Sequence, residues 1–237
     1  NNMIYLVLYF YIIMKKYYLG TDKFGRDVLS RIILGSRISF FIGFVAVFIS
    51  LIIGMTLGSI AGYYGGKIDL IIMWFINVTW SIPTLLLVIA ITLALGKGFW
   101  QVFIAVGLTM WVEVARVVRG EVLKIKELQY ITAAKTLGFN DFRIISKHII
   151  PNIIAPIIVI SAANFAAAIL IESGLSFLGI GAQPPICTWG GMVKSNFNDI
   201  ILGRPHLALI PGICIMMLVM SFMFIGNAVR DAMDVRN

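Results

Sequence analysis

The chain has 237 residues, of which 60% are hydrophobic and 13% are charged. A soluble domain usually carries about 45–50% apolar residues and about 25% charged ones, and one globule of this length has too little polar surface to cover the excess. This composition excludes an ordinary soluble enzyme and predicts an all-α integral membrane protein, because an open sheet would leave backbone groups unpaired in lipid. Its net charge of +8, placed beside apolar stretches, indicates membrane topology and contact with membrane lipid rather than nucleic acid.

The first apolar segment, Met3–Met14, has 12 residues and ends at Lys15-Lys16. Such a segment makes about 18 Å of helix, whereas the hydrocarbon core of a bilayer is about 30 Å thick. It is either a shortened span or the remainder of a truncated one. A cleaved signal peptide is disfavoured because the basic pair follows the apolar residues. We therefore expect residues 1–19 to be a shortened or truncated first span.

Residues 20–37 hold an amphipathic segment. A helix over Asp27–Arg37 places apolar side chains on one face, namely Val28, Leu29, Ile32 and Ile33. The polar side chains lie toward the other face, namely Asp27, Ser30, Arg31 and Arg37. This division of faces predicts a helix in the membrane interface.

Long apolar stretches predict five spans of a polytopic helical permease fold, with the N-terminal segment as a shortened sixth. They are Ile38–Ala61, Leu70–Leu95, Phe99–Val117, Asn152–Ile171 and Leu207–Val229. Ser81-Ile82-Pro83 interrupts the second stretch, so we expect its first part to lie near the interface and the part after Pro83 to cross. Within the first stretch, Gly54, Gly58 and Gly62 predict close packing on a neighbouring helix.

Basic residues set the orientation. The segment 116–148 carries seven Lys and Arg residues, whereas the segment 172–206 carries only Lys194 and Arg204. The positive-inside rule therefore places 116–148 and the C-terminus in the cytoplasm. One region disagrees, because residues 15–37 then lie outside although they hold six Lys and Arg residues. We keep the orientation, since Asp27–Arg37 is predicted to be an interfacial helix and not a plain loop.

The cytoplasmic segment 121–151 predicts two short helices joined by a tight turn. Glu127–Leu137 consists of helix formers, and Gly138 stands where a helix C-cap needs positive φ. Asn140 or Asp141 can cap the second helix, which we expect to run to about Ile150 and to end at Pro151. Two interpretations of the pair remain open: it docks on another protein, or it packs on the inner ends of its own spans.

The spacing of small residues in this segment resembles a known motif. Thr132-Ala133-Ala134 is followed by three residues, Gly138, nine residues and then His148-Ile149-Ile150-Pro151. This is similar to the "EAA" loop of ABC-importer permease subunits, whose consensus is Glu-Ala-Ala, three residues, Gly, nine residues and Ile-x-Leu-Pro. Thr132 replaces the usual Glu, so the resemblance leaves Glu127 or Lys135 to supply the polar contact.

Two further segments narrow the resemblance to the dipeptide, oligopeptide and nickel permeases. One runs from Gly20-Thr21-Asp22 through Gly25-Arg26-Asp27 to Ser39, and the other is Ser176-Phe177-Leu178-Gly179 with Trp189-Gly190. Arg230-Asp231-Ala232 is similar to the usual end of the group. The resemblance covers the chain from about Leu19 to Arg236.

The resemblance implies a transport subunit of a bacterial inner membrane, multi-pass and with a cytoplasmic C-terminus. Residues 38–237 would form the permease domain, with a coupling loop at 121–151 and an outer loop at 172–206 that is either a folded platform or a surface linker. The implied partners are a second homologous permease, two ATP-binding-cassette ATPase subunits that use ATP and Mg, and an extracytoplasmic binding protein. Contacts to the ATPases would come from Thr132, Ala133, Ala134, Lys135, Gly138, Asp141, Arg143 and Pro151. The expected cargo is a peptide, with nickel or another chelated metal as the second choice.

The sequence carries no catalytic motif that we recognise, and we expect neither a cofactor nor a resident metal. Gly66-Lys67 lacks the leading Gly of a P-loop and is followed by Ile68. Ser176 does not form a Gly-x-Ser-x-Gly nucleophile elbow, because Leu178 stands where the second Gly is needed. Two other classes stay as alternatives: an ATP-independent channel or carrier, which would not need the helix pair, and an intramembrane enzyme, which would need paired catalytic residues.

Polar groups inside the spans are candidates for the translocation path. Asn77, Asn164 and Glu172 are the residues that we select, although the two asparagines also suit hydrogen bonds between helices. Glu172 either lines the outer end of the path or holds the outer loop. Glu113 is expected to pair with Arg116, three residues further along the same helix.

Overall fold

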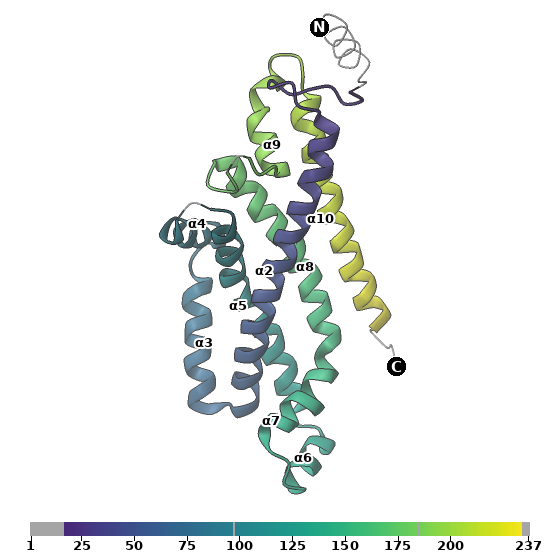
Figure 1. Ribbon diagram of the computed structural model, residues 1–237. Coiled ribbons are helices and arrows are strands. Elements are labelled where there is room, and N and C mark those ends of the chain that lie inside the picture. The colour runs from purple at the N-terminus through teal and green to yellow at the C-terminus, as the bar shows by residue number, and fades with distance from the viewer. Residues whose placement is uncertain (1–16, 97, 184, 234–237) are drawn as a thin grey trace, which may run out of the picture.

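The computed structural model describes residues 17–96, 98–183 and 185–233, and these ranges form a bundle of helices (Figure 1). The long helices are α2 (Val28–Tyr64), α5 (Phe99–Ile125), α8 (Ile154–Leu178) and α10 (His206–Met233). The shorter helices are α3 (Gly66–Trp80), α4 (Thr84–Leu95), α6 (Gln129–Thr136), α7 (Asp141–Ile144) and α9 (Trp189–Ser195). A π-helical turn, η1 (Ile145–Ile149), and two 3₁₀ turns, η2 (Ile150–Ile153) and η3 (Phe197–Ile200), complete the described elements. The first span predicted for residues 1–19 lies outside the described residues except for a turn that begins at Tyr17.

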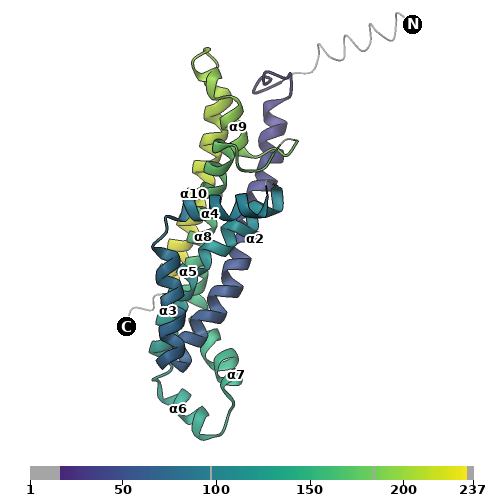
Figure 2. The ribbon, with the colours of Figure 1, turned by 90° about the vertical axis from the view of Figure 1, so that its left-hand side faces the viewer.

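Helices α2, α5 and α8 form the centre of the bundle, and α10 packs along α8 (Figure 1). The α6–α7 pair lies at one end of the bundle and α9 at the opposite end in both views (Figures 1 and 2). In the described part of the chain, four helices are long and apolar enough to cross a membrane, and a fifth span requires that α3 and α4 count together. The prediction of five spans therefore depends on this bent pair.

Helix α2 includes the predicted interfacial segment. It runs without a break for 37 residues, and the side chain of Asp27 caps it by accepting a hydrogen bond from the N–H of Ser30 (3.1 Å). Residues 28–37 are therefore helical as predicted, but they are the first turns of α2 and not a separate element. Gly35 lies inside this helix without interrupting it. It packs against the indole of Trp189 so closely that a Cβ would lie 2.8 Å from the ring, so the position has no room for a side chain.

The bend at Ser81-Ile82-Pro83 is confirmed, and which of its two halves crosses the membrane stays a prediction. The axes of α3 and α4 meet at 92°, and α3 lies along the bundle while α4 turns across it (Figure 1). Asp69 holds α3 in place by accepting two hydrogen bonds from Arg119 of α5 (2.5 and 2.6 Å). Ile76 is fully buried against α5. Val88 of α4 is also fully buried, in the core cluster that includes Val102 and Phe103 of α5, so both halves pack on the bundle.

Glycines bring α2 and α5 into close contact. A Cβ added to Gly54, Gly58 or Gly62 would lie within 3 Å of atoms of α5. At Gly58 the nearest atom is the backbone carbonyl oxygen of Ala115, at 2.6 Å. The predicted small-residue face is confirmed, and its partner is α5.

Candidate functional site

The turn between α6 and α7 has the predicted cap geometry. Gly138 follows α6 with φ of 78°, in the left-handed region that disfavours L side chains. Its N–H donates to the carbonyl of Lys135 (3.0 Å), and the N–H of Phe139 donates to that of Ala134 (3.2 Å). This pair of bonds is a Schellman motif, which satisfies two carbonyls at the end of the helix.

The second helix of the pair begins as predicted but does not end at Pro151. Asn140 caps α7 by accepting a hydrogen bond from the N–H of Arg143 (2.8 Å). The backbone then passes through the π turn η1 and the 3₁₀ turn η2 into α8, so helical structure continues across Pro151. A proline breaks α-helical bonding to the residue four positions earlier. Here the bonding pattern has already changed before Pro151, and regular α-helix resumes at Ile154.

One face of the helix pair is docked on the bundle. Its buried side chains join a core cluster with Val118 and Val122 of α5, and they are Ile131, Ala134, Ile144 and Ile149. The Tyr63 hydroxyl at the end of α2 donates to Asp141 Oδ1 (2.7 Å), and Lys135 Nζ lies 4.9 Å from the centre of the Tyr63 ring. The pair therefore packs on the ends of its own helices, which was one of the two predicted interpretations.

The opposite side of the pair is exposed and carries large apolar side chains among polar ones. Leu137 is 74% exposed and Phe142 is 78% exposed. Of the predicted contact residues only Ala134 is buried, and the exposed ones are Thr132, Ala133, Lys135, Gly138, Asp141, Arg143 and Pro151. Leu137 and Phe142 flank the turn between α6 and α7, where large exposed apolar side chains can serve as contacts for a partner protein. Phe142 was missed from the sequence, although an aromatic residue among the polar residues that open a short helix was a usable signal.

Arg116 does not pair with Glu113, contrary to the prediction. Its guanidinium donates to Asn77 Oδ1 (2.9 Å) and lies 3.6 Å from the centre of the Trp80 ring. Both partners belong to α3, so the packing of α3 on α5 takes Arg116 away from its neighbour on the same helix. Glu113 instead lines a cavity of about 180 Å³ at the α3–α4 bend, together with Thr79 and other residues.

The two other path candidates are buried in the described chain. Asn164 is 1% exposed, and neither of its side-chain polar atoms has a partner among the described residues. Glu172 is fully buried and accepts a hydrogen bond from the Ser176 hydroxyl (2.6 Å), which in turn accepts one from Thr188 (3.2 Å). Because Thr188 caps α9, this chain of bonds ties α8 to α9. It favours the second role predicted for Glu172, that of holding the outer loop. The place of Asn77, Asn164 and Glu172 on a translocation path stays a prediction.

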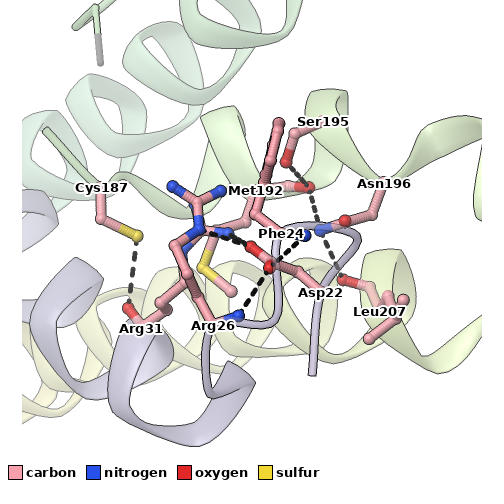
Figure 3. Close-up of polar contacts among 9 residues, drawn as sticks. All are labelled: Asp22, Phe24, Arg26, Arg31, Cys187, Met192, Ser195, Asn196 and Leu207. Carbon is pink, nitrogen blue, oxygen red and sulfur yellow. Dashed lines mark hydrogen bonds and ion pairs between the residues drawn. The ribbon is translucent and has the colours of Figure 1, made fainter. Parts of the chain in front are cut away.

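At the α9 end, a buried carboxylate organises the residues before α2 (Figure 3). Asp22 accepts hydrogen bonds from the N–H groups of Phe24 and Arg26 (2.9 Å each) and from Arg26 Nε (2.8 Å), and it also pairs with Arg31. Burial alone would raise the pKa of Asp22, but these N–H donors and the Arg26 guanidinium outweigh it, so the pKa lies below its ordinary value. Asp22 is therefore ionised near neutral pH.

The 172–206 segment is folded onto the start of α2. The indole N–H of Trp189 donates to the backbone carbonyl of Ile32 (2.9 Å). The thiol of Cys187 lies 3.5 Å from the backbone carbonyl oxygen of Arg31. The side-chain amide of Asn196 bridges to the carbonyls of Met192 and Leu207 (2.9 and 3.5 Å; Figure 3). These contacts favour the folded platform over the surface linker.

Comparison with family models matches residues 54–236 to the "Binding-protein-dependent transport system inner membrane component" family. The chain belongs to this family. The permease is 40% identical over 218 residues to the glutathione transport system permease protein GsiD of Pectobacterium atrosepticum, covering 92% of this chain and 72% of that protein. It is 41% identical over 218 residues to the dipeptide transport system permease protein DppC of Bacillus subtilis, covering 92% and 68% respectively. The predicted resemblance to ABC-importer permeases is thereby confirmed.

A solved structure of the MetNI methionine ABC transporter in an inward-facing conformation has the same fold. It superposes with a TM-score of 0.70 at 17% identity and covers 90% of this chain and 99% of the matched chain. The polytopic helical permease fold is therefore confirmed, and the permease is a multi-pass protein of the inner membrane.

Proposed function

We propose that this permease forms half of the translocation path of an ATP-binding-cassette importer for peptides. Relatives at about 40% identity are named as glutathione and dipeptide permeases, which supports a peptide cargo. In this proposal a second homologous permease completes the path, and an extracytoplasmic binding protein delivers the cargo at the α9 end. Two ATPase subunits bind and hydrolyse ATP with Mg at the cytoplasmic α6–α7 end. In this proposal the ATPase subunits supply the catalytic residues and hold the ATP and Mg, and the permease takes no part in the hydrolysis.

The observation that carries the proposal is the two-sided character of the α6–α7 pair. Its inner face is anchored by Ile131 and Ile144, which are fully buried, while Phe142 and Leu137 are exposed on the outer face. Burying one such side chain in a partner contributes about 1.5–3 kcal/mol. A surface that is both rigidly attached to the spans and adhesive on its free side suits the transmission of force from an ATPase subunit.

The mechanism that we propose is alternating access. Closure of the ATPase subunits on ATP would push the residues from Ala133 to Gly138. Because helical backbone continues from Asp141 through Pro151 into α8, the push would reach that span directly. The bond from Tyr63 to Asp141 (2.7 Å) would carry part of it to α2. ATP then acts by binding one arrangement of the spans better than the other.

Among the path candidates, Asn77 is the one that is exposed. We propose that it lines the path near the α3–α4 bend, whose cavity Glu113 lines. Asn164 would reach a substrate only after α8 moves, and Glu172 acts mainly by holding the outer loop. An ionisable group such as Glu113 is rare at membrane depth and is usually functional.

The test is Phe142→Ser in vesicles reconstituted with the ATPase subunits and the binding protein. We expect peptide uptake and capture of the ATPase subunits to fall at least about tenfold, while the amount of folded permease stays constant because the side chain is exposed. Ile68→Ser is the matched control, since Ile68 of α3 is also exposed (44%) at the same end but lies outside the pair. Full uptake by Phe142→Ser would refute the coupling role. Uptake without ATP would indicate a channel or carrier, and uptake of nickel but not of dipeptides or glutathione would refute the peptide cargo.

A further inference from the structure

A cavity of about 590 Å³ opens at the α9 end, between the residues that precede α2 and the outer loop. Four cationic side chains line it: Lys23, Arg26, Arg31 and Lys194. The first three belong to the basic segment 15–37, whose position outside the membrane the positive-inside rule does not explain. In the fold they meet Lys194, which comes from α9. Three of the positive charges of this segment are therefore used to line the cavity.

A buried ion-pair network holds two of the cationic side chains of the cavity in place. The side chain of Asp22 is 1% exposed and holds both Arg26 and Arg31, whose side chains are 48% and 15% exposed. One carboxylate thus orients two guanidinium groups without neutralising the four cations. Arg26 also stacks on the ring of Phe24, at 4.7 Å from its centre. Four cations that line one cavity with a single carboxylate leave a net positive charge, which attracts an anion.

The remaining lining residues suit a small polar anion. Hydrogen-bonding side chains line the cavity beside the cations, and they are Ser176, Gln183, Thr188, Ser195 and Asn198. The volume lies in the range of sites for small molecules. The apolar lining comes from Phe24, Ala182, Pro185 and Ile186, and no described residue from the middle of a span takes part. A phospholipid would need a longer apolar groove for its acyl chains, so the lining favours a soluble ligand.

We propose that this cavity is a carboxylate-binding site that receives the C-terminal carboxylate of the incoming peptide. The inference rests on the proposed peptide transport and names the group of the cargo that this permease recognises. Guanidinium groups bind carboxylates through two parallel N–H···O bonds, and Arg26 retains N–H groups beyond the Nε that it donates to Asp22. Lys194 adds a further positive charge to the lining from α9.

The test compares dialanine with dialanine amide, which lacks the terminal charge. Binding is measured on the full permease in phosphatidylcholine nanodiscs. We expect the amide to bind at least about tenfold more weakly, and Lys194→Gln to weaken dialanine binding about five- to tenfold while leaving amide binding unchanged. Arg37→Gln is the matched control, because Arg37 is exposed on the first turns of α2 but does not line the cavity. Dialanine binding should also weaken as salt is raised.

Equal binding of the two dipeptides, or no effect of Lys194→Gln, would overturn the inference even if uptake of peptides is normal. Phosphatidylglycerol that co-purifies with the permease and is lost in Lys194→Gln would overturn it in favour of a lipid site. An effect of Lys194→Gln that appears only with the binding protein present would overturn it in favour of an acidic side chain on that partner. Absent uptake, combined with dialanine binding that depends on Lys194, would refute the proposed function alone.

Discussion

Replacing Gly138 tests whether the cap of α6 is needed for coupling. A Cβ added there would meet no atom within 4 Å, but φ is +78°. The substitution therefore costs backbone strain and creates no collision. An L-residue in the left-handed region costs about 1–2 kcal/mol, Asn tolerates it best, and a β-branched residue tolerates it least. We expect the impairment to rise in the order Gly138→Asn, Gly138→Ala, Gly138→Val.

The structure indicates where this strain acts. If the chain leaves the left-handed region, it gives up the bonds from Gly138 to Lys135 and from Phe139 to Ala134. A strain of about 1.4 kcal/mol shifts the equilibrium toward the open cap about tenfold. The open cap would no longer fix the direction in which α7 follows α6, so ATP hydrolysis would continue while uptake falls.

The assay is the ratio of peptide uptake to ATP hydrolysis in the reconstituted transporter, with hydrogen exchange of the α6 amides as a direct measure of the cap. Exchange and uncoupling should rise together through the series. Gly138→Asn as impaired as Gly138→Val would refute the strain argument, because the shape of the surface would then matter more than the backbone. Normal coupling in Gly138→Val would refute the role of the loop as a lever.

Two further outcomes follow from packing and charge. Gly58→Val should lower the thermal stability of the purified permease, because its Cβ would lie 2.6 Å from the carbonyl oxygen of Ala115. Gly120→Val on α5 should change the stability little, because no atom lies within 4 Å of the added Cβ. Equal effects of the two substitutions would contradict close packing as the cause. The pKa of Asp22 lies below its ordinary value of 3.8, so its ion pairs stabilise the turn above about pH 4 and lose that effect as the pH falls through the lowered pKa. Pepsin should therefore cleave Asp22→Asn near Phe24 at pH 4.5, whereas cleavage of the unchanged permease there should need a pH below the lowered pKa of Asp22. Equal protection of both at pH 4.5 would argue against the carboxylate.

The sequence alone determined features that depend on neighbouring residues. Apolar length predicted α5, α8 and α10, because the bilayer sets the length of a span. Gly138 predicted a left-handed cap and Asn140 a helix start, since both depend on backbone conformation within a few residues. The glycines of α2 predicted a close contact, although their spacing did not say with which helix.

Tertiary structure decided every feature that depends on which helix faces meet. Arg116 binds Asn77 and Trp80 of α3 rather than Glu113, because the packing of α3 on α5 brings these two side chains to it. Lys23 and Lys194 line one cavity although 170 positions separate them in the chain. The sequence specifies the charge and length of each side chain, but the packing of the helices determines which groups surround it.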